Sequence, residues 1–340
     1  MSLASTWVRL GGITPATELA PHSPPTWETL ASGGSGEASF ELGRSAKFAP
    51  HLTQPGSLME IMVGPMRVWR GRVGDYDRAS GQVVGRGIHT DGNSIPGLDG
   101  GGAATRVVQT AITTALAAPW SWPITRNGVA GTLLGDATEP MMVWPMIEAL
   151  ADETGARAYF DPDGALYVTA DPTTPTWTIA PEAAAFGQTT EGQATRLVGR
   201  FLNIATGLNE TTIRVAAGEV VARAEIVDLI DRRGAMTLAQ ANSILDAALA
   251  ATKAKTGWVN AVTLHREQIT RNGTPAYLPA IHARNRMVRA QGVPATFGDI
   301  QATWLDAVLG KTTYTAGEDT ITLEPVDTAP RTLTDVLAAS

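Results

Sequence analysis

The sequence contains no cysteine, which excludes structural disulfides and catalysis by a thiolate. It also lacks any apolar run that approaches the ~20 residues of a membrane-spanning helix. The sequence has 26 lysines and arginines against 33 aspartates and glutamates, so its formal net charge is -7. This negative charge argues against binding nucleic acid by neutralising its phosphates. The first ten residues, MSLASTWVRL, lack the positive start and long apolar stretch of a secretory signal, so we expect synthesis in the cytoplasm.

The most regular part of the chain is residues 56–88, which are predicted to form a β-meander. Met59, Ile61 and Val63 alternate with Glu60 and Met62, a period typical of a strand with one buried face. Glycines inside or beside these strands indicate bulges or strongly coiled strands, as in a small closed barrel. The three predicted strands are residues 58–63, 66–73 and 82–88.

Other segments mix strands with helices. Further strands are predicted at residues 26–30, 37–42, 195–204, 211–216, 258–269, 281–293, 312–314 and 320–323, with a mixed segment at 220–232. A hairpin is expected at 157–170 around Pro162, Asp163 and Gly164. Helices are expected at 103–118, at 138–154 with Thr138 as N-cap and a possible kink at Pro145, and from Thr237, where Gln240 completes a capping box.

Two residue groups resemble metal sites only superficially. His89 and Asp91 are the nearest approach to a metal pair, but they have neither helical spacing nor an evident third ligand. Asp161 and Asp163 lie in a loop with Gly164, but the ligand alternation and the terminal glutamate of a calcium loop are missing. Turn formation explains both groups, so no metal is expected.

The remaining candidates for chemistry are equally incomplete. Residues 97–102 are rich in glycine and precede a helix, but no Lys-Ser or Lys-Thr pair closes a phosphate loop. Ser35 lies between two glycines without the strand and helix of a nucleophile elbow. Glu148 and Asp152 have helical spacing, which favours a solvated helix face. The sequence therefore predicts no enzyme: no catalytic, cofactor-binding or metal-binding residue is assigned, and no cofactor is expected.

Nine tryptophans are more than usual for this length. Trp120 and Trp122 flank a serine beside Pro123, an arrangement that would suit a sugar-stacking shelf in a loop. Packing in a core or at a subunit interface is the other interpretation, since tryptophan is enriched in both places.

The chain also resembles a known family, the tail-tip hub proteins (minor tail proteins) of long-tailed bacteriophages. Each motif is degenerate alone, and the resemblance lies in their common order along nearly the whole chain. The matching segments are GEASFEL at 36–42, PGSLMEIMVGPMRVWRGRVGDYD at 55–77, GRGI at 85–88, IEALADETGARAYFDPDGALYV at 147–168, TLAQANSILDAAL at 237–249, PAIHARNRMVRAQGV at 279–293 and YTAGEDTITLEP at 314–325.

This resemblance implies a mainly β fold with α+β parts: two small β-barrel hub domains and a mixed α/β accessory domain, interleaved along the chain. The implied pieces are 1–95 for the first barrel, 96–185 and 233–275 for the accessory domain, and 186–232 with 276–340 for the second barrel and a C-terminal tail.

The resemblance also implies a baseplate hub in the virion tail tip, made in the host bacterial cytoplasm. Three copies would form a homotrimeric ring that closes the tail tube and opens for DNA, which meets the protein only in transit. The implied partners are further copies of the chain, the distal tail protein, the tape measure protein and tail fibres or receptor-binding proteins. The alternative is a distal tail ring protein or a peripheral carbohydrate-binding minor tail protein.

Overall fold

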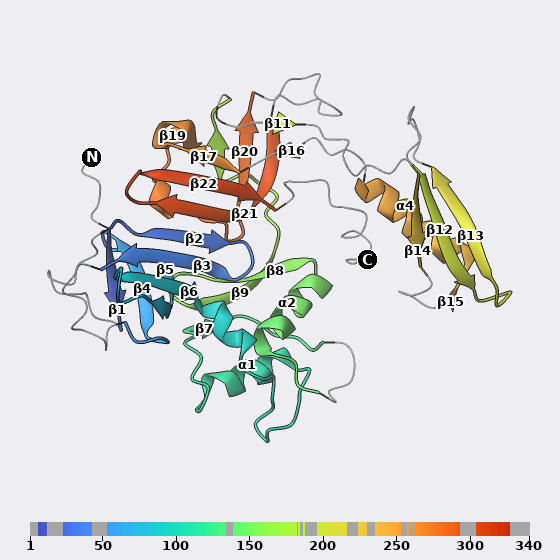
Figure 1. The fold of residues 1–340 in the computed structure, drawn as a ribbon, viewed down its shortest axis with the longest axis horizontal. Coiled ribbons are helices and arrows are strands. Elements are labelled where there is room, and N and C mark those ends of the chain that lie inside the picture. Colours follow the sequence, from blue (N-terminus) through green and yellow to red (C-terminus); the bar gives the residue numbers. More distant parts are fainter. Residues whose placement is uncertain are drawn as a thin grey trace. The chain divides into compact units, whose positions relative to one another are not determined.

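A computed structural model gives the fold of the chain (Figure 1). The structure describes residues 6–11, 23–42, 53–133, 139–181, 183, 186–187, 196–215, 224–229, 235–252, 257–258, 261–292 and 304–326. The chain divides into two compact units, each described here by itself. The larger unit comprises Met1–Ala184, Ala261–Gly292 and Trp304–Val326, and the smaller one comprises Ala185–Asn260, Val293–Thr303 and Asp327–Ser340.

The larger unit is built on one sheet, whose first half has the strand order β1-β4-β5-β6-β3-β2. These strands are β1 (Thr6–Leu10), β2 (Thr26–Leu30), β3 (Gly34–Glu41), β4 (Leu58–Val63), β5 (Met66–Tyr76) and β6 (Gln82–Gly87). The predicted meander is confirmed, because β4, β5 and β6 pair antiparallel in sequence order. The expected single buried face of β4 is wrong, since Glu60 and Met62 are buried along with the apolar alternate positions.

This half of the sheet is strongly curved into a half-barrel (Figure 1). Strand β2 comes close to β5 although β6 and β3 lie between them in the sheet. Gly71 of β5 permits the tight coiling, because a Cβ at this position would lie 2.1 Å from the carbonyl oxygen of Arg86 on β6. Trp69 fills the space beneath, and its Nε1 donates to the carbonyl oxygen of Gly36.

Strand β21 (Trp304–Thr315) joins the two halves of the sheet. Its first residues pair with β20 (Met287–Gln291), and residues 311–315 pair with β2. The second half has the order β17-β22-β21-β20-β10-β18-β19. Its other strands are β10 (Trp177–Ile179), β17 (Val262–Leu264), β18 (Ile269–Arg271), β19 (Thr274–Pro275) and β22 (Thr320–Pro325).

The second half curls back towards itself. Strands β17 and β18 are five strand spacings apart in the pairing order, about 24 Å if the sheet were flat. The chain nevertheless connects Leu264 to Ile269 through the short 3-10 helix η4 (Arg266–Gln268), a connection that spans at most about 17 Å. The continuous strand predicted at 258–269 is therefore wrong: the segment contains β17 and η4, preceded by β16 (Gly257–Trp258) in the smaller unit.

An α/β layer of the larger unit packs around the 3-10 helix η3 (Ile88–Asn93). It contains α1 (Val108–Leu116), α2 (Val143–Glu153), β7 (Arg126–Asn127), β8 (Ala156–Phe160) and β9 (Ala165–Ala170). The helices and the β8–β9 hairpin share a core that includes Trp122, Trp144 and Phe160. The hairpin prediction is confirmed, with Gly164 at a φ of +88° in its turn.

Both predicted helices of this layer are shorter than expected. Helix α1 begins only after Val107, because the preceding residues turn around Asp99. Helix α2 begins at Val143, so Pro145 lies in its first turn, where the missing N–H breaks no helical hydrogen bond. The predicted cap at Thr138 lies outside the described residues.

The smaller unit is a layered α/β structure. Its main sheet comprises β12 (Arg196–Asn203), β13 (Asn209–Val215), β14 (Ala224–Asp228) and β15 (Ala235–Met236), and one face packs on α4 (Leu238–Thr252). A two-stranded pairing joins β11 (Phe186–Gly187) to β16. The predicted capping box is confirmed: Thr237 N–H donates to Gln240 Oε1 at 2.9 Å, and Gln240 N–H donates to Thr237 Oγ1 at 3.2 Å.

The fold class predicted from the sequence, mainly β with α+β parts, is confirmed. Within the smaller unit, Ala241 and Leu245 of α4 share a core with Leu197 and Phe201 of β12. The resemblance groups α4 with residues 96–185 in an accessory domain. The division into two barrels and an accessory domain stays a prediction.

Candidate functional site

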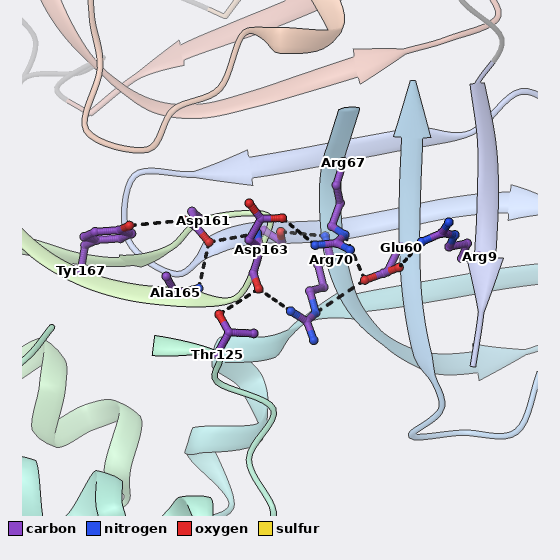
Figure 2. Close-up of polar contacts among 10 residues, drawn as sticks. Arg9, Glu60, Arg67, Arg70, Thr125, Asp161, Asp163, Ala165 and Tyr167 are labelled. Atoms are coloured by element: carbon purple, nitrogen blue, oxygen red, sulfur yellow. Dashed lines mark hydrogen bonds and ion pairs between the residues drawn. The ribbon is translucent and has the colours of Figure 1, made fainter. Parts of the chain in front are cut away.

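Among the described residues of the larger unit, an arginine–carboxylate network lies between β1, β4, β5 and the β8–β9 hairpin (Figure 2). Glu60 of β4 lies at its centre. Arg67 and Arg70 approach from β5, and Arg9 approaches from β1. Asp163 completes the network from the turn of the hairpin.

Glu60 is buried with three arginines around it. Its carboxylate lies 3.0 Å from Arg67 Nε, 3.8 Å from Arg70 Nε and 3.8 Å from Arg9 Nη1, and only 5% of its side chain is exposed. A buried carboxylate is tolerated only when cations or donors compensate for its lost hydration. The three arginines provide this compensation and hold β1, β4 and β5 together.

Asp163 connects this charge cluster to the α/β layer (Figure 2). Its carboxylate lies 2.6 Å from Arg67 Nη1, and its backbone carbonyl accepts from Arg70 Nη1 at 2.5 Å and from Thr125 Oγ1 at 3.0 Å. Burial lowers the pKa of Arg70, whereas the nearby Glu60 carboxylate acts in the opposite direction. These contacts thereby fix the hairpin turn to β5.

Arg284 lies in the same region and is fully enclosed. Its Nη2 donates to the carbonyl oxygen of Val68 on β5 at 3.1 Å, and burial lowers its pKa to about 10. The negative charge of Asp161 favours its charged form. Since Arg284 belongs to the segment before β20, it connects the second half of the sheet to β5 and to the hairpin.

The network is suited to holding segments together and contains no arrangement for bond making. Its carboxylates and carbonyls are occupied by arginine donors, and its members are neither nucleophiles nor bases presented to a cavity. Within the described ranges, no three histidine, aspartate or glutamate side chains are grouped so that they could hold a metal ion. Nor is any helix there long and apolar enough to cross a membrane.

His89 and Asp91 have different partners in the structure. The Asp91 carboxylate lies 2.5 Å from Arg72 Nε, and burial raises its pKa despite that arginine. His89 packs against Trp144, with ring centroids 5.5 Å apart, and burial lowers its pKa to about 4. Each residue therefore has a structural environment of its own.

The loop candidates are turns held by their own aspartates. Asp99 Oδ1 accepts from the N–H groups of Gly101 and Ala103, and Asp161 Oδ1 accepts in the same way from Asp163 and Ala165. These bonds explain the glycine-rich segment at 97–102 and the aspartates of the hairpin as turn formers.

The serine and helix-face candidates also have structural partners. Ser35 is buried, and its Oγ accepts from the backbone N–H of Arg70 at 3.2 Å. Glu148 accepts from Ser32 Oγ at 3.1 Å, whereas Asp152 is exposed four residues further along α2.

The sugar-stacking shelf at Trp120 and Trp122 is contradicted. Trp122 is 2% exposed, packs edge-on against Phe160 and donates from Nε1 to the carbonyl oxygen of Ile88 at 2.9 Å. Trp120 is 38% exposed. The two rings therefore do not form one surface, because Trp122 belongs to the core.

Sequence reasoning missed the arginine network. Glu60 occupies a position that strand alternation predicts to face solvent, and Arg284 lies in an irregular segment more than 200 residues from its partner Val68. The one available signal was a glutamate facing an arginine-rich neighbour, since Arg67, Arg70 and Arg72 follow it closely in the meander.

The chain is similar to known proteins in structure and not in sequence. No family model matches the chain, and no curated protein matches it by sequence. Among solved structures, it is similar to the tail protein from Neisseria meningitidis MC58, with a TM-score of 0.57, 16% identity and coverage of 94% of this chain and 95% of that one.

Two prophage proteins are similar over the same extent. The 43 kDa tail protein of prophage MuSo2 from Shewanella oneidensis gives a TM-score of 0.59 at 12% identity, covering 96% of this chain and 99% of that one. The prophage tail protein gp18 from Listeria monocytogenes EGD-e gives 0.50 at 11% identity, covering 98% and 97%. The chain therefore has the fold of phage tail proteins along nearly its whole length.

Proposed function

We propose that this chain is a structural component of a bacteriophage tail tip, a homotrimeric baseplate hub ring that closes the tail tube. The observation that carries the proposal is the full-length likeness in fold to three tail proteins, two of them from prophages. These structures cover between 94% and 98% of this chain, so the likeness is not confined to one of its two units.

The sheet supports a role in building a ring. A curved sheet whose two halves share β21 is a stiff element, because strands from distant parts of the chain are hydrogen-bonded side by side. Three copies with two barrel-like halves each would present six similar surfaces to a six-fold tube. Ring opening for DNA would then change contacts between subunits, with the difference in free energy stored at those contacts.

The chemistry of the described residues supports a structural role without catalysis. Most candidates from the sequence have a turn, core or ion-pair function, and the arginine–carboxylate network joins β1, β4, β5 and the hairpin. The net charge of -7 fits a channel to which DNA does not adhere. In this proposal the partners are the distal tail protein, the tape measure protein and fibres or receptor-binding proteins.

The alternative of a peripheral carbohydrate-binding protein loses its main support, since Trp122 is in the core. A distal tail ring protein is distinguished by its assembly state. The mass of the purified full-length chain in solution tests the proposal: we expect three times the mass of one chain. A hexamer would favour the distal tail ring, and a monomer at high concentration would contradict a self-assembling ring.

A further inference from the structure

The main sheet of the smaller unit has one open face. On β13, Ile213 and Val215 point away from α4, and Ile226 of β14 does the same. The pairing register places Ile213, Val198 and Ile226 side by side across the three strands. Ile213 is 60% exposed and Ile226 is 68% exposed. Within the smaller unit, no described helix or strand covers the face of this sheet opposite α4 (Figure 1).

An apolar outer face is unusual for a sheet that faces water. In antiparallel sheets the solvent side normally carries polar residues, whereas sheets with parallel pairs are usually covered on both faces. Here β12 pairs in parallel with both β14 and β15. The pairing and the side chains therefore both indicate a third layer over the open face.

The covered face shows what this sheet accepts. Helix α4 packs Ala241 and Leu245 on it, and Leu245 lies over Gly199 where a Cβ would meet its Cδ1 at 2.5 Å. Beside this apolar contact, Arg214 of β13 forms a two-bond pair with Asp246 of α4, both bonds 2.6 Å long. The covered face thus binds an amphipathic helix that carries an acidic residue beside its apolar stripe.

We propose that the open face of β12, β13 and β14 binds an amphipathic helix of a different tail protein, one that carries acidic residues beside its apolar stripe. The proposal rests on the proposed function for the class of partner. In this proposal, the row Ile213, Val198 and Ile226 contacts the apolar stripe of the helix. Arg196 pairs with one of its acidic side chains.

The open face of the sheet carries arginines beside its apolar row, as the covered face does. Arg196 and Arg200 of β12 lie on either side of Val198 and point to the open side. Arg200 Nη2 is already 2.9 Å from the Asp228 carboxylate. Arg196 is exposed, and none of the ion pairs within the described part of the chain includes it. Arg214 pairs with Asp246 on the covered face, and we assign the same role to Arg196 on the open face.

The size of the face favours a single helix. Three strands of about seven residues cover about 14 by 23 Å. That is well below the ~800 Å² per partner of a stable dimer interface. A helix of 15 residues, the length of α4, is about 22 Å long and 10 Å wide and would cover it.

A second copy of the chain has no suitable helix to offer among the described residues. The apolar faces of α1 and α2 are buried in the core that contains Trp122 and Phe160, and that of α4 is buried on β12. A helix from another protein, with an acidic side chain placed to pair with Arg196, is the occupant that we propose.

The test uses the full-length chain and a designed probe. The probe is a fluorescent, side-chain-stapled peptide of 15 residues, the length of α4, with leucines spaced three and four apart and glutamates beside them. The control peptide has lysine in place of each glutamate. We expect the acidic peptide to bind about tenfold more tightly than the basic one, and Arg196→Glu to reverse this order.

Variants then locate the binding. The double variant Ile213→Lys and Ile226→Lys is expected to weaken binding of the acidic peptide by about tenfold or more, because it places charges in the apolar row. Leu116→Lys, an exposed apolar position on α1, is the matched control and should leave binding unchanged. Far-ultraviolet circular dichroism verifies that the variants are folded.

Equal binding of both peptides to wild type and double variant would overturn the proposal, as would no binding up to about 1 mM peptide. A change in the mass of the chain's own assembly caused by the double variant would show a contact between copies and would also overturn it. The proposed hub function fails separately, through the mass of the wild-type chain without peptide.

Discussion

Glu60 Oε1 lies 3.0 Å from Arg67 Nε inside the network, and the Arg67 guanidinium reaches Asp163 from the same position, with its Nη1 2.6 Å from that carboxylate. One arginine thus joins a buried carboxylate of β4 to an exposed one in the hairpin turn. The two ends differ in their surroundings, since 5% of the Glu60 side chain is exposed against 78% for Asp163. Removing either carboxylate should therefore have different consequences.

Glu60→Gln is expected to lower the free energy of unfolding by about 3 kcal/mol, because the arginines around it would lose their buried counter-charge. Asp163→Asn should cost less, about 1 kcal/mol, because that carboxylate is largely in water. Chemical denaturation followed by tryptophan fluorescence measures both. Asp75→Asn, which removes an exposed partner of Arg86, is the control, and an equal loss for Glu60→Gln and Asp75→Asn would contradict the role of the network.

Gly34→Ala is expected to destabilise the fold by about 3 kcal/mol or more. Gly34 has a φ of +86°, and a Cβ there would lie 2.1 Å from the carbonyl oxygen of Phe160, where β3 meets β8. Gly102→Ala is the matched control, because Gly102 also has a φ of +86° and a Cβ at that position meets nothing within 4 Å. Thermal unfolding of the two variants compares them, and similar melting temperatures would show that the close approach of β3 and β8 is wrong.

Acid should weaken the packing around His89. Burial lowers the pKa of His89 to about 4 from an ordinary value of about 6.5, so the unfolded chain binds this proton more readily than the folded chain. The contribution of neutral His89 to stability is complete above pH 6.5 and is lost as the pH falls towards 4, by about 3 kcal/mol. His282, whose pKa burial also lowers, acts in the same direction.

His89→Gln tests this dependence, because it removes one titrating group while keeping a polar side chain of similar size. The free energy of unfolding of the variant should fall less between pH 6.5 and 4 than that of wild type. The same slope in both proteins would mean that His89 is solvated in the folded chain.

Trp122→Ala should reduce the free energy of unfolding by about 3 to 5 kcal/mol, as expected for a large aromatic residue in a core. Trp120→Ala should change it by less than about 1 kcal/mol. A glycan-array measurement on wild type and on these two variants also tests carbohydrate binding. Glycan binding that depends on Trp120 would restore the carbohydrate-binding alternative.

Local signals in the sequence predicted what depends on neighbouring residues. Gly64 and Pro65 separate β4 from β5, Gly164 turns the β8–β9 hairpin, and Thr237 with Gln240 caps α4. Each of these features is determined within a few residues, so composition and spacing identify it.

Local sequence signals could not predict features that depend on contacts between distant residues. The pairing of β2 with β21 joins residues almost 290 positions apart, and the burial of Trp122 depends on Phe160 and the carbonyl of Ile88. The sequence pattern did not predict the arginine–carboxylate network for the same reason: Glu60 is buried only because β1 and the arginines of β5 cover it. Strand alternation alone assigns that position to solvent.

Electron microscopy of assembled tails, with a tag on this chain, tests the proposed hub ring most directly. We expect three copies in one ring at the tip of the tail tube, with the curved sheets of the larger unit contacting the tube. Density for this chain along the tube, in a six-copy ring above the tip or only on peripheral fibres would contradict it.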